Sequence, residues 1–168
     1  MSKMAAIVNS EKVTIRIATK KDIPTVDALW KESAQYHSEL DTRLAMQFDN
    51  TQHITEFHTK QLEKEDTLFL VATTIKVVVG FLIAHIVTLQ PHHTLNRLGV
   101  IDGMAVTHSF RGQGIGSLLF DKTLEWFEAH KVERIDTSVA AKNPRAQTFW
   151  KRKGFTPRIY HITFDMTA

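Results

Sequence analysis

Three glycines in the segment Arg111-Gly112-Gln113-Gly114-Ile115-Gly116 carry the clearest chemical signal in the sequence. Glycine lets a backbone come close to a ligand because it has no side chain. The apolar residues 100–106 precede the segment and an amphipathic stretch follows it, which predicts a strand that turns into a helix. The first amides of a helix have no intrahelical partners, and the helix dipole favours negative charge there. The segment therefore predicts a site for a pyrophosphate group.

Two common phosphate-binding motifs do not match this spacing. The Walker loop requires a lysine directly after its last glycine, whereas Ser117 follows Gly116. The dinucleotide fingerprint Gly-x-Gly-x-x-Gly opens a βαβ unit, but here the glycines come late in the chain, after strands of antiparallel character. The loop therefore belongs to another class of nucleotide-binding protein.

A second segment follows the glycine loop: Asn143-x-x-Ala146-x-x-Phe149-Trp150-x-x-x-Gly154-Phe155. Asn143 before Pro144 predicts the start of a short helix, because asparagine caps helices and proline suits their first position. Gly154 before an apolar residue predicts the left-handed end of that helix. By itself, the segment needs no ligand to explain it.

The elements that must position these segments follow from hydrophobic periodicity. Strands are expected at residues 13–18, 68–74, 77–89, 100–106 and 134–139, with one or two more in 155–164. One helix is expected to begin at a cap formed by Thr19 and Asp22. Two others are expected at about residues 51–64 and at about residues 114–130. The third of these helices has four apolar residues at core spacing: Ile115, Leu118, Leu119 and Trp126. This order predicts one α/β domain over residues 1–168, with an ordered core of about 13–166 and helices on both faces of a mixed sheet.

Composition narrows the class of protein. The chain has no cysteine, so it has no disulfide framework, thiolate metal site or cysteine nucleophile, and a cytoplasmic location is expected. No apolar run is long enough to span a bilayer, and no signal peptide is recognisable at the N-terminus. Eight basic side chains against two acidic ones lie between residues 131 and 158, which suits either a polyanionic ligand or a solvated basic face.

Together, Arg111-x-x-Gly114-x-Gly116 and the segment from Asn143 to Phe155 resemble the signatures of the GNAT superfamily of N-acetyltransferases. The resemblance covers nearly the whole chain, since residues 15–19 with Asp22 and Ile23 are similar to the usual opening of such proteins. It implies the GNAT acyl-CoA N-acyltransferase fold, in which a central mixed and mostly antiparallel sheet has helices on both faces. It also implies acetyl-CoA as the acetyl donor.

The resemblance further implies which residues would bind acetyl-CoA. Backbone amides of the glycine loop would hold the pyrophosphate: Arg111, Gly112, Gln113, Gly114, Ile115, Gly116 and Ser117. Backbone groups of Met104, Ala105 and Val106 would pair with the pantetheine arm, provided that their strand separates from its neighbour. Asn143 would bond the pantetheine, Phe149 and Trp150 would lie near the thioester, and Arg145 and Lys151 could meet the 3′-phosphate.

Acetyl transfer requires a neutral amine, and a lysine-like amine is only about 0.1% neutral at pH 7. A base is therefore needed, often acting through water. Asp102 lies one side-chain alternation before Met104, where some relatives have a catalytic glutamate. Asp102 is the candidate base; otherwise it binds the substrate amine or accepts a hydrogen bond at the end of the strand.

The family usually has a tyrosine where this chain has Trp150, and that tyrosine protonates the departing thiolate. An indole is only a donor and cannot act as this acid. The thiolate could leave unassisted, water could protonate it, or Tyr160 or His161 could replace the tyrosine. Trp150 would then form an aromatic wall beside the thioester.

Histidines invite a metal hypothesis, which the spacing does not favour. His92 and His93 are adjacent, and adjacent side chains are expected to diverge. His85 is expected in the core or on a sheet face, and His53 and His58 lack a carboxylate partner for a ligand set. No metal is therefore expected.

The acceptor is expected to be a primary amine of a small molecule or peptide, bound along residues 36–51, which include Glu39, Asp41, Arg43, Phe48 and Asp49. The competing hypothesis is a CoA-binding regulatory module that has lost catalysis, consistent with Trp150. Nucleic-acid binding is not expected, because no recognition motif accompanies the basic pI. Among relatives a homodimer is common, often through the C-terminal strands.

Overall fold

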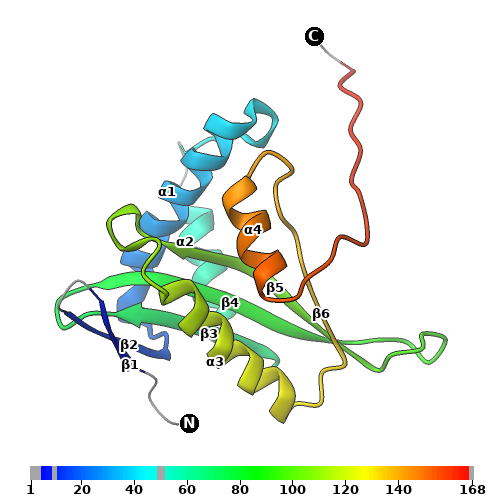
Figure 1. Cartoon of the computed structure of the whole chain (residues 1–168), viewed down its shortest axis with the longest axis horizontal. Coiled ribbons are helices and arrows are strands. Elements are labelled where there is room, and N and C mark those ends of the chain that lie inside the picture. The colour runs from blue at the N-terminus through cyan, green and yellow to red at the C-terminus, as the bar shows by residue number, and fades with distance from the viewer. Residues whose placement is uncertain (1–4, 9–10, 49–51, 167–168) are drawn as a thin grey trace. The chain divides into compact units, whose positions relative to one another are not determined.

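Six strands form one sheet in the first of the chain's two compact units, Met1–Ser138. The computed structural model describes residues 5–8, 11–48 and 52–166 (Figure 1). The second unit, Val139–Ala168, contains one helix and the C-terminal segment. The single domain expected over residues 1–168 stays a prediction.

The strands follow the chain in order across the sheet, and each of the first four is antiparallel to the next. They are β1 (Ala5–Val8), β2 (Glu11–Ile17), β3 (Thr67–Thr73), β4 (Val78–Thr88), β5 (Arg97–Val106) and β6 (Arg134–Thr137). Strand β6 alone is parallel to its neighbour, β5. The sheet is thus mixed and mostly antiparallel, as predicted. Sequence reasoning missed β1, because a short apolar run without alternation does not distinguish a strand from other structure.

The helices of this unit are α1 (Ile23–Leu40), α2 (Gln52–Gln61) and α3 (Ile115–Ala129), with short 3-10 turns η1 (Lys20–Asp22), η2 (Thr42–Leu44) and η3 (His108–Phe110). The predicted contact between Thr19 and Asp22 is present at the start of η1, the turn that leads into α1: the Thr19 amide and hydroxyl both donate to Asp22 Oδ2, at 2.7 and 2.8 Å. Two guanidinium nitrogens of Arg16 add bonds of 2.7 Å to the same carboxylate. The hydrogen bonds from Arg16 are the largest cause that lowers the pKa of Asp22 to about 2.

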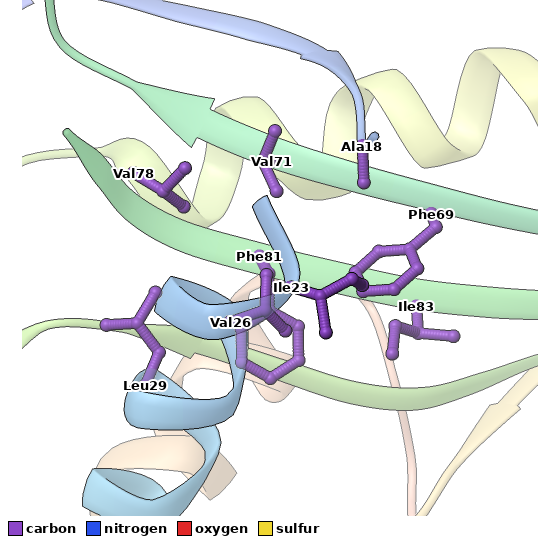
Figure 2. Packing of buried hydrophobic residues seen from close by; sticks show 9 residues of the cluster. All are labelled: Ala18, Ile23, Val26, Leu29, Phe69, Val71, Val78, Phe81 and Ile83. Carbon is purple, nitrogen blue, oxygen red and sulfur yellow. The ribbon is translucent and has the colours of Figure 1, made fainter. Parts of the chain in front are cut away.

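The two faces of the sheet are covered by different helices (Figure 1). On one face, Phe69 and Val71 of β3 lie opposite Ile83 and Phe81 of β4 and form a buried cluster with apolar side chains of α1: Ile23, Val26 and Leu29 (Figure 2). On the other face, a Cβ added to Gly99 of β5 would come within 2.6 Å of the Phe127 ring of α3. Burial of each such large side chain contributes about 1.5–3 kcal/mol. The prediction of helices on both faces is confirmed.

The core stripe of α3 is rotated slightly from the predicted one. Ile115 and Leu119 are fully buried, as expected, but Leu118 and Trp126 are only half-buried. Phe120 and Phe127 are buried in their place. Neighbouring apolar residues on a helix differ by about 100° in direction, and composition alone did not decide which of them faces the sheet.

In the second unit, α4 (Pro144–Arg152) has the predicted caps at both ends. Asn143 Oδ1 accepts a bond of 3.0 Å from the Ala146 amide. Gly154 has a φ of 89°, and the Phe155 amide donates to the Trp150 carbonyl at 3.0 Å. A left-handed glycine closes the helix in this way because it has no Cβ to clash.

The prediction of one or two strands in residues 155–164 is wrong: no strand follows α4 in the described residues up to 166. The alternation of apolar side chains is present, but a strand requires a neighbour that completes its hydrogen bonds. Several of the apolar side chains are largely exposed, with values of 65% for Ile159, 81% for Tyr160, 94% for Ile162 and 84% for Phe164. None of the helices in the described ranges is long and apolar enough to cross a membrane.

Candidate functional site

Strand β5 extends beyond its parallel neighbour. Pairing with β6 runs from Leu98 opposite Arg134 to Ile101 opposite Thr137, and β5 then continues for five residues, 102–106. Along these five residues, no strand of the described first unit pairs with that edge of β5. Met104, Ala105 and Val106 lie there. The end of this pairing is compatible with the strand separation that a pantetheine arm would require, and the binding role of these residues stays a prediction.

The glycine loop joins β5 to α3, as expected for a strand-to-helix junction. Gly112 and Gly114 have φ angles of 77° and 85°, which side chains rarely adopt, and a Cβ at either position would meet no atom within 4 Å. Gly114 is the N-cap of α3, and the Leu118 amide makes a bond of 3.1 Å to its carbonyl. The amides of the first helical residues, Ile115, Gly116 and Ser117, precede this bond and have no intrahelical acceptor. The space beside both glycines is thus open, and it adjoins a helix start whose amides suit an anion.

Arg111, at the start of the loop, directs its donors into the protein. Its backbone amide donates to the His108 carbonyl at 3.2 Å and its Nε to the Val106 carbonyl at 2.7 Å. Its Nη2 donates to Glu32 Oε1 of α1 at 2.7 Å. Sequence reasoning missed Glu32, because no local pattern connects two residues 79 positions apart.

Asp102 lies at a bulge in β5 and contacts a histidine of β4. Ile101 pairs with Ala84 and Gly103 with Ile83, so Asp102 is the extra residue between them. Its Oδ2 lies 2.7 Å from His85 Nδ1, and both side chains are about one third exposed. A carboxylate at Nδ1 favours the tautomer whose lone pair is on Nε2, which can accept a proton. His85 is on a sheet face, as expected, but its pairing with Asp102 was not predicted.

An open cleft of about 550 Å³ adjoins this pair. Its walls come from α2, from the connection between α2 and β3, and from strands β4 and β5. The lining residues are Phe57, Gln61, Lys64, Glu65, Asp66, Thr67, His85, Ile86 and Asp102. Three carboxylates against one lysine make the cleft acidic when its histidine is neutral. The half-exposed Phe57 adds an apolar wall.

The stretch expected to bind the acceptor, residues 36–51, does not line this cleft where the structure describes it. Asp41 instead bonds Arg43 within the η2 turn, with a shortest distance of 2.6 Å. Phe48 packs edge-on against Trp30, with ring centroids 6.2 Å apart. Asp49 and Thr51 lie outside the described residues.

In the second unit, the predicted site residues lie at the N-cap of α4, on the helix and after it. Trp150 packs edge-on against Phe149 and Phe155, with ring centroids 5.0 and 4.9 Å apart. Asn143 caps the helix through its carbonyl oxygen. Tyr160 lies on the C-terminal segment beyond α4, and its side chain is largely exposed. The roles proposed for these residues stay predictions.

The histidines are arranged differently from expectation. The rings of His92 and His93 lie 4.4 Å apart, so the expected divergence of the two side chains is wrong. His58 is fully buried, and its Nδ1 lies 2.6 Å from Asp27 Oδ1, so it does have a carboxylate partner. In the part of the chain that the structure describes, no three histidine or acidic side chains gather as a metal site would require.

Comparison with known proteins gives a consistent result. Residues 26–155 match the sequence model of the acetyltransferase (GNAT) family. Over 68 residues the chain is 32% identical to a mycothiol acetyltransferase of Beutenbergia cavernae; the match covers 40% of this chain but only 23% of that longer protein.

Solved structures share the fold at low sequence identity. The BH1408 protein of Bacillus halodurans, solved as a tetramutant, has a TM-score of 0.80 at 22% identity, covering 90% of this chain and 99% of its own. The aminoglycoside N-acetyltransferase AAC(6')-Iy, solved in complex with CoA, has a TM-score of 0.71 at 15% identity, covering 100% of this chain and 99% of its own. At these identities the likeness shows the fold.

Proposed function

The chain belongs to the GNAT acetyltransferase family, and from this premise we propose that it transfers the acetyl group of acetyl-CoA to a primary amine. The acceptor is a small molecule or peptide, and the amine attacks directly in a ternary complex. One observation carries the proposal: the His85–Asp102 pair lies at the bulge where the free edge of β5 begins, and it opens into an acidic cleft.

The donor half of the site uses the glycine loop and the free edge of β5. Amides from Gly112 to Ser117 bind the pyrophosphate, and backbone groups of Met104, Ala105 and Val106 bind the pantetheine arm. In the second unit, Asn143 bonds the pantetheine, Phe149 and Trp150 flank the thioester, and Arg145 and Lys151 meet the 3′-phosphate. The open space over Gly112 and Gly114 supports the first of these assignments.

The acceptor half of the site contains the group that accepts a proton from the amine. An ammonium ion cannot attack, so one proton must leave the nitrogen before the new bond forms. His85 Nε2 accepts this proton, directly or through water, while Asp102 holds the opposite ring nitrogen. The amine nitrogen then bonds to the acetyl carbon, the carbon–sulfur bond breaks to release the CoA thiolate, and the nitrogen loses its second proton to water to give the neutral amide. Tyr160 is the candidate acid for this thiolate, since Trp150 cannot protonate it.

The decisive experiment incubates the protein with acetyl-CoA and a panel of primary amines and follows the release of free thiol. The panel includes an aminoglycoside, because a protein of similar fold carries that class of substrate in its name. Amine-dependent release supports the transferase, and its abolition in His85→Gln ties the activity to the cleft. Tight binding of acetyl-CoA without release on any amine would instead support a regulatory module, which Trp150 at the usual tyrosine position favours.

We also propose a homodimer that forms through the C-terminal segment, because alternating side chains there are largely exposed: Tyr160, Ile162, Phe164 and Met166. Isolated apolar residues are common on protein surfaces, but a strand-like row of them is typical of an interface. A cytoplasmic location stays a prediction from the cysteine-free sequence.

A further inference from the structure

One carboxylate of α1 accepts hydrogen bonds from three residues of the segment that leads into the glycine loop. Glu32 Oε2 accepts a bond of 3.0 Å from the Thr107 hydroxyl. Its Oε1 accepts bonds from the His108 amide at 2.9 Å and from Arg111 Nη2 at 2.7 Å. The three donors span the η3 turn, between the end of β5 and Gly112. A single side chain therefore fixes both ends of this turn.

Arg111 links this carboxylate to the end of the strand. Its Nε bonds the Val106 carbonyl, and its guanidinium carbon lies 5.7 Å from the ring centroid of Tyr36, one helical turn after Glu32. The Arg111 side chain is 18% exposed. Its positive charge thus faces a carboxylate and an aromatic ring of α1. These contacts weaken any interaction of the guanidinium with a phosphate.

We propose that Glu32 is a positioning residue for acetyl-CoA, which acts through Arg111 to hold the glycine loop in its binding conformation. The inference rests on the proposed function, in which the loop amides from Gly112 onward bind the pyrophosphate. A loop ordered before binding loses less conformational freedom when the ligand arrives, so preorganisation raises affinity. Arg111 then holds the loop in position, and the backbone amides contact the pyrophosphate.

Simple electrostatics gives the opposite expectation. CoA carries several negative charges, and removing a carboxylate near its phosphates would strengthen binding if charge alone mattered. It would also release Arg111, which could then pair with a phosphate. The positioning role predicts weaker binding after the same change. The sign of the effect therefore separates the two explanations.

The test is the Kd of CoA for the wild-type protein and for Glu32→Gln, measured by calorimetry. Glu128→Gln is the matched control, since Glu128 is an exposed residue of α3 with the same charge. Loss of hydrogen bonds between charged groups should weaken CoA binding about tenfold in Glu32→Gln. The control should bind like the wild type. Equal or tighter binding by Glu32→Gln would overturn the inference.

A phosphate-free donor separates positioning from general damage to the fold. S-acetylpantetheine lacks the pyrophosphate, so its KM should be the same for Glu32→Gln and the wild type. A KM raised as much as the Kd of CoA would mean that the variant disturbs the whole site, and the inference would fall. Arg111→Lys keeps the charge but loses the Nε bond, and it should also bind CoA less tightly. Absence of CoA binding by the wild-type protein would overturn the proposed function and this inference together.

Discussion

His85 on β4 and Asp102 on β5 lie on adjacent antiparallel strands with 2.7 Å between Nδ1 and Oδ2. His85 pairs with Val100, and Asp102 lies two residues further along β5, so ordinary alternation places both side chains on the same face of the sheet. The bulge at Asp102 shifts only the pairs that follow, from Gly103 opposite Ile83 onward. Strand register therefore brings the two side chains together.

The first prediction concerns the proton acceptor. His85→Gln keeps a polar side chain of similar size but cannot take up a proton at neutral pH. General base catalysis contributes typically 10²–10⁴-fold, so kcat/KM for the amine should fall by at least about 100-fold. The decline of kcat/KM toward acidic pH, where a base becomes protonated, should disappear with it.

Asp102→Asn distinguishes the roles of the two partners. If Asp102 only orients the ring, the variant should keep part of the activity and its dependence on acidic pH. Added imidazole should restore activity to His85→Gly but not to Asp102→Asn. A pH profile of His85→Gln that matches the wild type would remove His85 from the mechanism and leave Asp102 as the direct base.

The second prediction compares glycines with the same backbone conformation. Gly112→Ala and Gly154→Ala both force a side chain into a positive φ, 77° and 89°, and neither new Cβ meets an atom within 4 Å. Each should lower the free energy of unfolding by about 1–2 kcal/mol. Only Gly112→Ala should also weaken CoA binding, because its methyl group occupies the space over the loop. Equal CoA affinity in the two variants would contradict a phosphate site at Gly112.

Local patterns in the sequence predicted the features of the fold and of the candidate site that join residues close together in the chain. The glycine loop, the Thr19–Asp22 contact and the caps of α4 each involve residues a few positions apart, so spacing was enough to identify them. The pairs Glu32–Arg111 and His85–Asp102 join residues 79 and 17 positions apart. Helix packing and strand register bring such residues together, and a single sequence does not encode either one locally.

The third prediction uses the ion pair between Arg16 and Asp22, at the η1 turn that leads into α1. Because Arg16 lowers the pKa of Asp22 from 3.8 to about 2, Asp22 contributes stability only while it is ionised. The contribution is complete above about pH 4 and is lost as the pH falls through 2. Arg16 is partly exposed, so solvent screening reduces the contribution to the order of 1–2 kcal/mol.

Denaturant unfolding of Asp22→Asn should therefore show a loss of this size at pH 7 and a much smaller one near pH 2. Asp165→Asn is a control for the removal of an exposed carboxylate and should match the wild type at both pH values. A loss that is the same at both pH values would mean that shape rather than charge at Asp22 stabilises the helix start.

The fourth prediction separates the two roles of Asn143. Asn143→Asp keeps the oxygen that accepts from the Ala146 amide, so α4 should stay capped, whereas Asn143→Ala should cost about 1 kcal/mol. Both variants lose the amide donor that a pantetheine carbonyl would accept. If Asn143 binds the cofactor, CoA affinity should fall in both. If it is only a cap, affinity should survive in Asn143→Asp, and this is read by calorimetry beside thermal unfolding.

The last prediction concerns the C-terminal segment. Ile162 is 94% exposed in a row of alternating apolar residues, and such a row is best stabilised by a strand or sheet of another chain. Light scattering should therefore give the mass of a dimer for the wild-type protein, and Ile162→Lys should shift the equilibrium toward monomer because it places a charge in the interface.

Ile75 is as exposed, at 95%, but lies in the turn between β3 and β4, so Ile75→Lys should leave the dimer intact. A monomeric wild type, or equal dissociation of both variants, would rule out the C-terminal segment as the interface. Because the row contains Tyr160, comparison of Tyr160→Phe with Ile162→Lys also separates a chemical role of the hydroxyl from a structural role of the segment.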